Sequence, residues 1–430
     1  MADKRWGEKM RESEMAKKLP PEGMPRTDIV ATLSRLKDGD IRWAEGRTPM
    51  FVFKGDEEVS AASREAFNMF FGENALAARR AYPSVRRMEE DILSIGLDLL
   101  HGSDEARGYF TTGGTESIMA AVKAARDMQR SLRGDTKLRG NMVLPETAHP
   151  AFTKSCDLMD LEERRVPVGE DCRADPAAME AATDNDTMMI VGSVPCFPYG
   201  VVDPIPELSE LAMRRGLWLH VDACVGGYLA PFAAELGRDI PTWDFKLAGV
   251  SSISADLHKF GYAPKPASTV FFANAEKADK LLFSYDVWPN GIYLTATIVG
   301  TRPAGGVAGA WATLHGLGRD GYLRVNQRLF ALVDRYREGI ESIPGLRVIA
   351  DPQLSILSFT SDEVNLHQAG ERMRERGWLP GFIKRPTGMH LMLSLIHEQS
   401  CEDWLSDLRW AVDAERNAQQ SLKAKVTVEY

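Results

Sequence analysis

Short apolar runs alternate with amphipathic segments through the middle of the chain. The runs lie at 108–112, 141–144, 187–191, 217–221, 251–254 and 268–272. Between them, the spacing of apolar residues predicts helices over 116–132, 150–156, 175–182 and 205–215. Runs that alternate with helices are typical of β-α units and of a mostly parallel sheet that is buried on both faces.

The two ends of the chain follow other patterns. The first 55 residues are polar and contain several prolines, and they predict an arm with one helix over 26–38; helices over 58–71 and 84–100 follow. Near the C-terminus, the pattern predicts helices over 321–343, 366–377 and 401–425, with apolar runs at 346–350, 354–360 and 390–395. We therefore predict an arm (1–55), a large α/β domain (56–318) and a small α+β domain (319–430).

Composition narrows the function classes. The formal net charge is −9 and no long basic run is present, which disfavours nucleic acid as a partner. The five cysteines are widely spaced and form no C-x-x-C pair, so we expect neither a disulfide framework nor a metal site, and a cytoplasmic protein. Residues 1–18 lack the apolar core of a secretory signal, and no apolar stretch reaches the roughly 20 residues of a transmembrane segment.

A glycine pair lies between a predicted strand and a predicted helix, in the sequence TTGGTES at 111–117. Gly113 and Gly114 allow the backbone to approach an anion, the helix N-terminus offers free N–H groups, and Thr115 adds a hydroxyl. An ordinary β-α turn can carry the same pair. Because neither G-x-x-x-x-G-K-[ST] nor G-x-G-x-x-G is present, a nucleotide is not the expected ligand.

A carboxylate follows the apolar run at 217–221, in the sequence HVDAC. Asp222 would point into the crevice where open α/β sheets bind ligands, and it could keep a pyridine nitrogen protonated. Ala223 is small enough to lie beneath a flat ring. The alternatives are a helix cap, which is common, and a metal ligand, which would need a cluster of acidic or histidine residues.

A lysine follows the next apolar run, in the sequence SSISADLHK at 251–259. A restrained lysine can act as a nucleophile toward an aldehyde, and Ser254 and His258 could donate to a phosphate. The alternative for Lys259 is a solvated surface lysine, but its distance from Asp222 along the chain suits the next strand of one sheet. His149, after the run at 141–144, could stack on a pyridine ring.

The order of glycine turn, histidine, aspartate and lysine resembles that of fold-type I enzymes of pyridoxal 5′-phosphate (PLP), in the group II decarboxylase lineage. Longer strings resemble the sphingosine-1-phosphate lyase family from about Gly46 almost to the C-terminus. They are TTGGTESIMAAVKAARD (111–127), AHPAFTKSC (148–156), FPYGVVDPIPEL (197–208), LHVDACVGGYLAPF (219–232), SSISADLHKFGYAPK (251–265) and GIYLTATIVGTRPAGG (291–306).

This resemblance implies PLP held as a Schiff base on Lys259, with Asp222 at the pyridine nitrogen and His149 stacked on the ring. It implies a homodimer with active sites at the interface, where Gly300 and Thr301 reach the cofactor phosphate of the other subunit. Lys265 matches the lysine that meets the substrate phosphate. The implied reaction is a retro-aldol cleavage of a phosphorylated β-hydroxy amine to a long-chain aldehyde and phosphoethanolamine.

The chain departs from the family pattern on the substrate side. Phe53 stands where the family has a tyrosine, and the stretch 74–83 lacks the expected histidine. Arg79 or Arg80 could bind the phosphate instead, or could lie on a solvated face.

The residues also leave the hydroxyl base and the reaction class open. Tyr199 and Tyr262 are candidates for the base, and Lys259 is a candidate for proton transfer at the amine carbon. The alternatives in reaction are an L-amino acid decarboxylase and a β-hydroxy amino acid aldolase of the same lineage. A catalytically silent binding subunit is disfavoured because the lysine, aspartate and histidine are intact.

Overall fold

The structure is a computed structural model that describes residues 18–428, with side chains to residue 418. The chain divides into two compact units, residues 1–42 and 43–430. In the first unit, α2 (Arg26–Leu36) continues into a single 3-10 turn at Lys37–Gly39, close to the helix predicted over 26–38, and neither element contains a buried residue.

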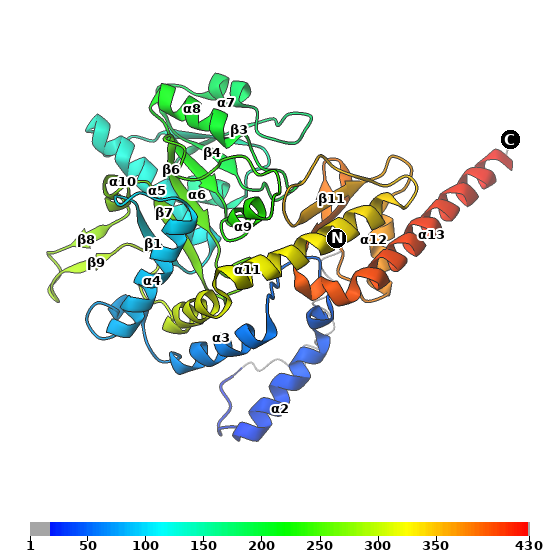
Figure 1. Ribbon diagram of the computed structural model, residues 1–430, viewed down its shortest axis with the longest axis horizontal. Coiled ribbons are helices and arrows are strands. Elements are labelled where there is room, and N and C mark those ends of the chain that lie inside the picture. The colour runs from blue at the N-terminus through cyan, green and yellow to red at the C-terminus, as the bar shows by residue number, and fades with distance from the viewer. Residues whose placement is uncertain (1–17, 429–430) are drawn as a thin grey trace. The chain divides into compact units, whose positions relative to one another are not determined.

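A seven-stranded sheet forms the centre of the second unit (Figure 1). Its strands are β1 (Arg107–Thr111), β2 (Asn141–Pro145), β3 (Glu162–Val166), β4 (Thr187–Ser193), β5 (Trp218–Asp222), β6 (Val250–Ala255) and β7 (Ser268–Phe272). Their order is β1-β7-β6-β5-β4-β2-β3, and β7 alone runs antiparallel to its neighbours. Six strands therefore match the six predicted runs within one or two residues.

Both faces of this sheet are buried, as the continuous apolar runs predict. Strand β5 sends Leu219 and Val221 into one hydrophobic cluster and Trp218 into another, because alternate side chains of a strand point to opposite faces. The covering helices include α5 (Gly114–Arg133), α6 (Ala151–Met159), α7 (Pro176–Ala182) and α8 (Ile205–Arg215). The carboxyl ends of the parallel strands and the N-terminus of α5 thus meet at one edge.

Several elements were not predicted, among them α9 (Ala230–Glu235), α10 (Ala275–Asp279), β8 (Phe283–Tyr285) and β9 (Tyr293–Thr295). Two others, β3 and the first half of α11, show why a pattern can miss an element. Strand β3 has the sequence EERRV, and its charges pair within the strand, as in Arg164 to Glu162 at 2.7 Å. It lies at the sheet edge, where charged side chains are tolerated, so it carries no apolar run. The helix predicted from Gly321 begins at Ala304: α11 (Ala304–Glu341) is interrupted at Gly318, with φ of 55°.

The first half of α11 escaped prediction because its glycines lower helix propensity. These glycines allow close packing instead. A Cβ at Gly309 would lie 2.3 Å from Cγ of Pro264, and one at Gly306 would lie 2.4 Å from the carbonyl oxygen of Pro266. The helix therefore approaches the chain segment just beyond Lys259 closely.

An antiparallel sheet lies C-terminal to α11. Its strands are β10 (Arg347–Val348), β11 (Ile356–Thr360), β13 (Thr387–Met392) and β12 (Phe382–Lys384), in that order, accompanied by α12 (Leu366–Glu375) and α13 (Cys401–Val428). Residues 46–53, which we call the strap, attach to this region. The backbone N–H groups of Leu379 and Met392 donate to the carbonyls of Arg47 and Pro49.

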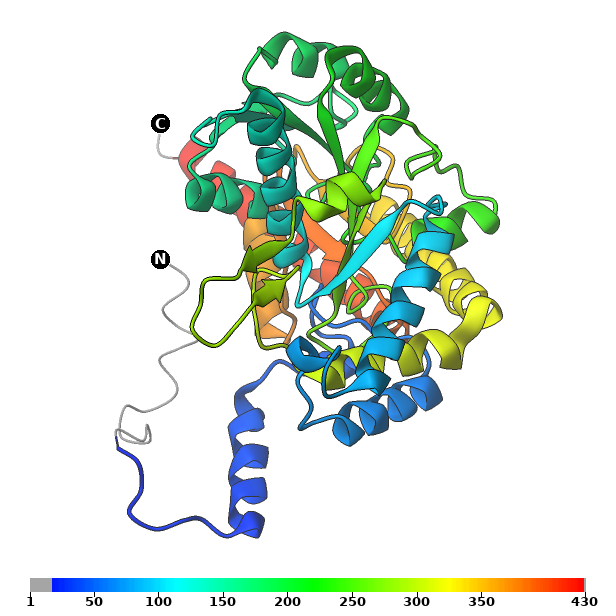
Figure 2. The ribbon, with the colours of Figure 1, turned by 90° about the vertical axis from the view of Figure 1, so that its left-hand side faces the viewer.

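The remaining elements lie around the large sheet. They are α3 (Glu57–Met69), α4 (Pro83–Leu99), α9 (Ala230–Glu235), α10 (Ala275–Asp279) and the two-stranded hairpin β8 (Phe283–Tyr285) and β9 (Tyr293–Thr295). Figures 1 and 2 both show this hairpin projecting from the large sheet. Over the described residues, no helix has the length and apolar character needed to cross a membrane.

Candidate active site

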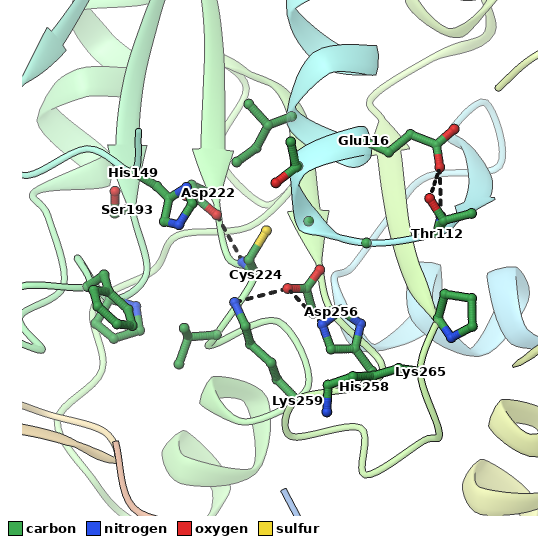
Figure 3. A pocket seen from close by; sticks show the side chains of 18 residues that line it. Thr112, Glu116, His149, Ser193, Asp222, Cys224, Asp256, His258, Lys259 and Lys265 are labelled. Atoms are coloured by element: carbon green, nitrogen blue, oxygen red, sulfur yellow. Dashed lines mark hydrogen bonds and ion pairs between the residues drawn. The ribbon is translucent and has the colours of Figure 1, made fainter. Parts of the chain in front are cut away.

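A cavity of about 450 Å³ opens at the edge where β4 and β5 end and α5 begins (Figure 3). Its size is within the range of small-molecule sites. It is lined by Thr112, Gly113, Gly114, Thr115, Glu116, Ile118, His149, Ser193, Pro195, Phe197, Asp222, Cys224, Val225, Asp256, His258, Lys259, Lys265 and Pro266. The structure thus brings the glycine turn, the histidine, the aspartate and the lysine together.

Lys259 forms an ion pair with a buried carboxylate in this cavity. Its Nζ lies 3.0 Å from Oδ2 of Asp256, which is 2% exposed and also accepts a hydrogen bond from Oγ of Ser268. Burial by itself lowers the pKa of Lys259, but the charge and hydrogen bond of Asp256, together with Cys224 and Asp222, outweigh burial and the pKa is raised. Asp256 was not among the predicted site residues, although it lies three residues before Lys259 in the same string.

Asp222 is fixed by two donors at the end of β5. Its Oδ1 accepts from the backbone N–H of Cys224 at 3.1 Å and from Oγ of Ser254 at 3.3 Å. Ser254 is fully buried on β6, where it also lies 3.2 Å from Nε2 of His220. Ser254 and the buried Ala223 are not lining residues; the contact of Ser254 with a phosphate stays a prediction.

The N-terminus of α5 is open toward the cavity. No side chain caps it at Gly113, whereas Asp56, Asp175 and Asn365 cap α3, α7 and α12. A Cβ at Gly114 would lie 2.8 Å from both Oδ2 of Asp256 and Sγ of Cys224, so only glycine permits this approach. The N–H groups of the first turn are therefore available to an anion.

Glu116 holds this turn in place, a role that our sequence analysis missed. Its Oε2 accepts from the backbone N–H and the hydroxyl of Thr112, each at 2.7 Å, and its Oε1 accepts from the backbone N–H groups of Ile298 and Val299. The buried carboxylate thereby ties the glycine turn to the segment that follows the hairpin. Its partners are 182 and 183 residues away, so no local pattern reveals the link.

Two histidines line the cavity with different surroundings. His149 is exposed, and its Nδ1 accepts from the backbone N–H of Ala151 at 3.1 Å, so the neutral ring carries its proton on Nε2. Nδ1 of His258 donates to the carbonyl of Ala267 at 2.6 Å. Burial lowers the pKa of His258. The neutral ring then has no proton on Nε2, so His258 would need protonation to donate to a phosphate.

Lys265 lines the cavity and is tied to the strap. Its Nζ donates to the carbonyl oxygen of Phe51 at 3.1 Å and lies 6.0 Å from the ring centre of Phe53. Burial, followed by repulsion from Lys259, lowers the pKa of Lys265. Phe53 packs against Phe260 with ring centres 5.1 Å apart and is not a lining residue.

Other candidates lie outside the cavity lining. The hydroxyl of Tyr199 donates to the carbonyl of Arg385, and the buried Tyr262 donates to Asn326 at 3.3 Å. Arg79 and Arg80 are exposed, and neither lines the cavity.

The two residues expected from a second subunit are also outside this chain's cavity. Thr301 is exposed and accepts from Asn74, and Gly300 is half-buried. Neither lines the cavity described here, and their roles stay predictions.

The lining suits PLP. Among its lining residues, Lys259 and the buried Asp222 lie at or just after the ends of adjacent strands, and the uncapped N-terminus of α5 opens into the same cavity. These groups match an aldehyde, a pyridine nitrogen and a phosphate, respectively. Over the described residues, no cluster of three or more potential ligands offers a competing metal site.

Comparison with known proteins places the chain in a family. Residues 73–361 match the model of the pyridoxal-dependent decarboxylase conserved domain. The sphingosine-1-phosphate lyase of Oryza sativa is 36% identical over 408 residues, which cover 93% of this chain and 75% of that protein. The chain belongs to the sphingosine-1-phosphate lyase family.

One solved structure and one further relative are also similar to this chain. A solved structure of the sphingosine-1-phosphate lyase of Burkholderia pseudomallei superposes with a TM-score of 0.89 at 35% identity and covers 97% of each chain. A probable L-aspartate decarboxylase of Pyrococcus furiosus is 33% identical over 361 residues, which are 84% of this chain and 94% of that protein. The fold is that of fold-type I PLP enzymes, the cofactor is PLP, and the family is one of PLP-dependent lyases.

Proposed function

We propose that this lyase-family member cleaves a phosphorylated β-hydroxy amine of the sphingosine 1-phosphate type. The products would be a long-chain aldehyde and phosphoethanolamine. The observation that carries the proposal is the presence of two lysines in one cavity: Lys259, paired with Asp256, and Lys265, at the side of the strap. The first suits an aldehyde and the second a substrate phosphate. The names of the relatives support the same substrate.

We assign each cofactor contact to a described residue. Lys259 would bond to the aldehyde carbon, Asp222 would keep the ring nitrogen protonated, and His149 would stack on the ring. The turn at Gly113–Thr115 would bind the phosphate. When bound, PLP draws electrons from the carbon that carries the substrate amine.

The remaining steps are proton transfers and positioning by this chain. The bond between the amine-bearing and hydroxyl-bearing carbons breaks as the hydroxyl proton passes to a base, which leaves an aldehyde. The amine-bearing carbon then receives a proton, for which the ammonium form of Lys259, once the lysine is no longer bonded to the cofactor, is the proposed donor. Tyr199 and Tyr262 stay candidates for the hydroxyl base, although their hydroxyls point to Arg385 and Asn326. Lys265 would hold the substrate phosphate.

Products distinguish this reaction from its alternative. Holoenzyme mixed with sphingosine 1-phosphate should release aldehyde and phosphoethanolamine in equal amounts, measured by mass spectrometry. The alternative is an L-amino acid decarboxylase, which the similarity to the Pyrococcus protein and Phe53 favour. Carbon dioxide from L-aspartate, with no aldehyde from the lipid, would replace the lyase proposal with that one.

We also propose a homodimer with its active sites at the interface, in the cytoplasm. The hairpin and the segment after it expose apolar side chains. These are Phe283, Tyr285, Val287, Trp288, Ile292, Leu294, Ile298 and Val299. A patch of this kind marks an interaction surface, and it runs directly into Gly300 and Thr301.

Charged substitutions on the hairpin test the dimer. Val287→Asp combined with Leu294→Asp should convert the dimer to a monomer in light scattering and lower activity with it. Met213→Asp, at an equally exposed apolar position on α8, is the control. A hairpin variant that remains dimeric would remove the hairpin from the interface.

A further inference from the structure

The loop at 197–200 is held at Phe197, Pro198 and Gly200 by the four-stranded sheet of β10 to β13, which lies in the predicted small domain and which we call the small-domain sheet. The carbonyl of Phe197 accepts from Nε2 of His390 on β13 at 2.9 Å, and the carbonyl of Pro198 accepts from Oγ of Ser358 on β11 at 2.6 Å. Gly200, with φ of 75°, packs so closely that a Cβ would lie 2.5 Å from the carbonyl oxygen of Ile356. The loop cannot move without these contacts changing.

Phe197 connects this attachment to the active site. Of the four loop residues, Phe197 alone lines the cavity. Its ring lies between two histidines, 4.6 Å from the ring centre of His390 and 6.4 Å from that of His149, to which it is perpendicular. The small-domain sheet therefore fixes an apolar side chain of the cavity wall.

His390 is suited to hold this wall rigidly. It is 2% exposed, and burial lowers its pKa to about 4, so the ring is neutral near neutral pH. The Nε2 proton is committed to the Phe197 carbonyl, and Nδ1 has no hydrogen-bond partner among the described atoms. A buried ring nitrogen without a partner is destabilising, and it is tolerated here in a ring that packs against Phe197.

The structure of the proposed substrate indicates which of its parts would contact Phe197. The carbon bearing the phosphate and the carbon leading to the hydrocarbon chain lie on opposite sides of the amine-bearing carbon. Figure 3 shows Lys265 and His149 on opposite sides of Lys259. With the amine near Lys259 and the phosphate at Lys265, the chain would leave on the side of His149, against which Phe197 packs.

We propose that Phe197 is a specificity-determining residue that contacts the hydrocarbon chain of the substrate, and that His390 and Ser358 are its positioning residues. The inference rests on the proposed function. It predicts that chain-length preference depends on contacts made outside the large domain.

The first test is a substrate series with one phosphorylated headgroup and increasing chain length. In the parent holoenzyme, each methylene that Phe197 helps to bury should raise kcat/KM up to about fourfold. Phe197→Ala should lower kcat/KM about tenfold for long chains and leave the shortest substrate nearly unchanged. Phe197→Leu, which keeps an apolar side chain, should retain most of the preference and guards against a folding defect.

Binding provides a readout that is independent of turnover. A long-chain analogue that lacks the hydroxyl cannot be cleaved, so calorimetry on the holoenzyme gives its Kd directly. Phe197→Ala should weaken this binding about as much as it lowers kcat/KM. An equal loss for short and long analogues would overturn the role of Phe197 in chain binding.

The positioning residues are tested by removal and rescue. His390→Leu and Ser358→Ala should raise KM for long substrates more than for short ones, with kcat little changed. His390→Gln can still donate to the Phe197 carbonyl and should restore the preference. The control is Thr360→Val, which removes a hydroxyl-to-carbonyl bond to Thr387 in the same sheet without touching the loop.

The outcomes separate this inference from the proposed function. If the parent cleaves no phosphorylated amine of any length, the proposed function fails. If the parent cleaves them and chain-length preference is the same in all variants, the proposed function stands and the inference is wrong. If Thr360→Val acts like Ser358→Ala, the effect is one of sheet stability, and the positioning role is refuted.

Discussion

The two ends of the active-site cavity are built differently. At the end that we propose holds the cofactor (the cofactor end), Lys259, Asp256 and Asp222 lie on or just after adjacent strands of one sheet, and Asp256 and Asp222 are buried within hydrogen-bond distance of their partners. At the end that we propose holds the substrate (the substrate end), Lys265 is tied to a residue 214 positions away, and Phe197 to one 193 positions away. The pairing of neighbouring strands sets the positions of the residues at the cofactor end. The positions of Lys265 and Phe197 at the substrate end depend on the strap and on the small-domain sheet.

We therefore expect residues at the cofactor end to determine whether the reaction occurs, and residues at the substrate end to determine which substrate is preferred. Changes at the cofactor end should affect every substrate equally, because the cofactor reacts with the amine in each. Changes at the substrate end should alter the preference among substrates and leave the cofactor spectrum unchanged.

Lys259→Ala should reduce turnover below detection with every substrate, because Lys265, the other lysine of the cavity lining, is tied to the Phe51 carbonyl. The visible absorption band of the lysine-bound cofactor should disappear as well. Lys154→Ala, an exposed lysine on α6, should leave both unchanged. Wild-type turnover in Lys259→Ala would show that the cofactor end has been placed wrongly.

Asp256→Asn should shift the pH dependence of cofactor uptake by the apoprotein. Only the unprotonated amine of Lys259 can attack the aldehyde, so uptake rises with pH. The Asp256 carboxylate raises the pKa of Lys259 against the effect of burial, so removing its charge should move this rise to lower pH. Stopped-flow absorbance measures the profile, with Asp279→Asn as an exposed control. A shift to higher pH would contradict the assigned pairing.

The cofactor end could be predicted from the sequence more completely than the substrate end. The glycine turn, Asp222 and Lys259 each lie in one short string, and the spacing of Asp222 and Lys259 predicts neighbouring strands, which β5 and β6 confirm. Glu116 and Phe197 were not predicted because their partners, Ile298 and His390, are distant in sequence. Tyr199 lies in a family string, but its hydroxyl is directed to the carbonyl of Arg385, which only the tertiary structure reveals.

Lys265→Gln should raise KM for the phosphorylated amine about 10- to 100-fold, the range expected when a hydrogen bond to a charged group is lost. The amide can still donate to the Phe51 carbonyl, so the strap contact is kept and only the charge is removed. The dephosphorylated amine should be affected little, and Lys154→Gln, at an exposed lysine on α6, is the surface control. Equal effects on both amines would remove Lys265 from phosphate binding.

Glu116→Gln should weaken cofactor retention by about tenfold or less. The substitution keeps one acceptor oxygen but replaces the other by an amide nitrogen, so either the Thr112 side or the Ile298 side loses its acceptor. Equilibrium dialysis of PLP measures the loss, and limited proteolysis near Ile298 should increase in parallel. Unchanged retention and unchanged proteolysis would show that this carboxylate does not hold the turn.

The most direct test of the whole account is the identity of the lysine that carries the cofactor. Borohydride reduction of the holoenzyme converts the bond between lysine and cofactor into a stable one, and peptide mass spectrometry then locates it. The account predicts a phosphopyridoxyl group on Lys259 and none on Lys265. A modification on Lys265, or on a lysine outside the cavity, would contradict the assignment of the two ends.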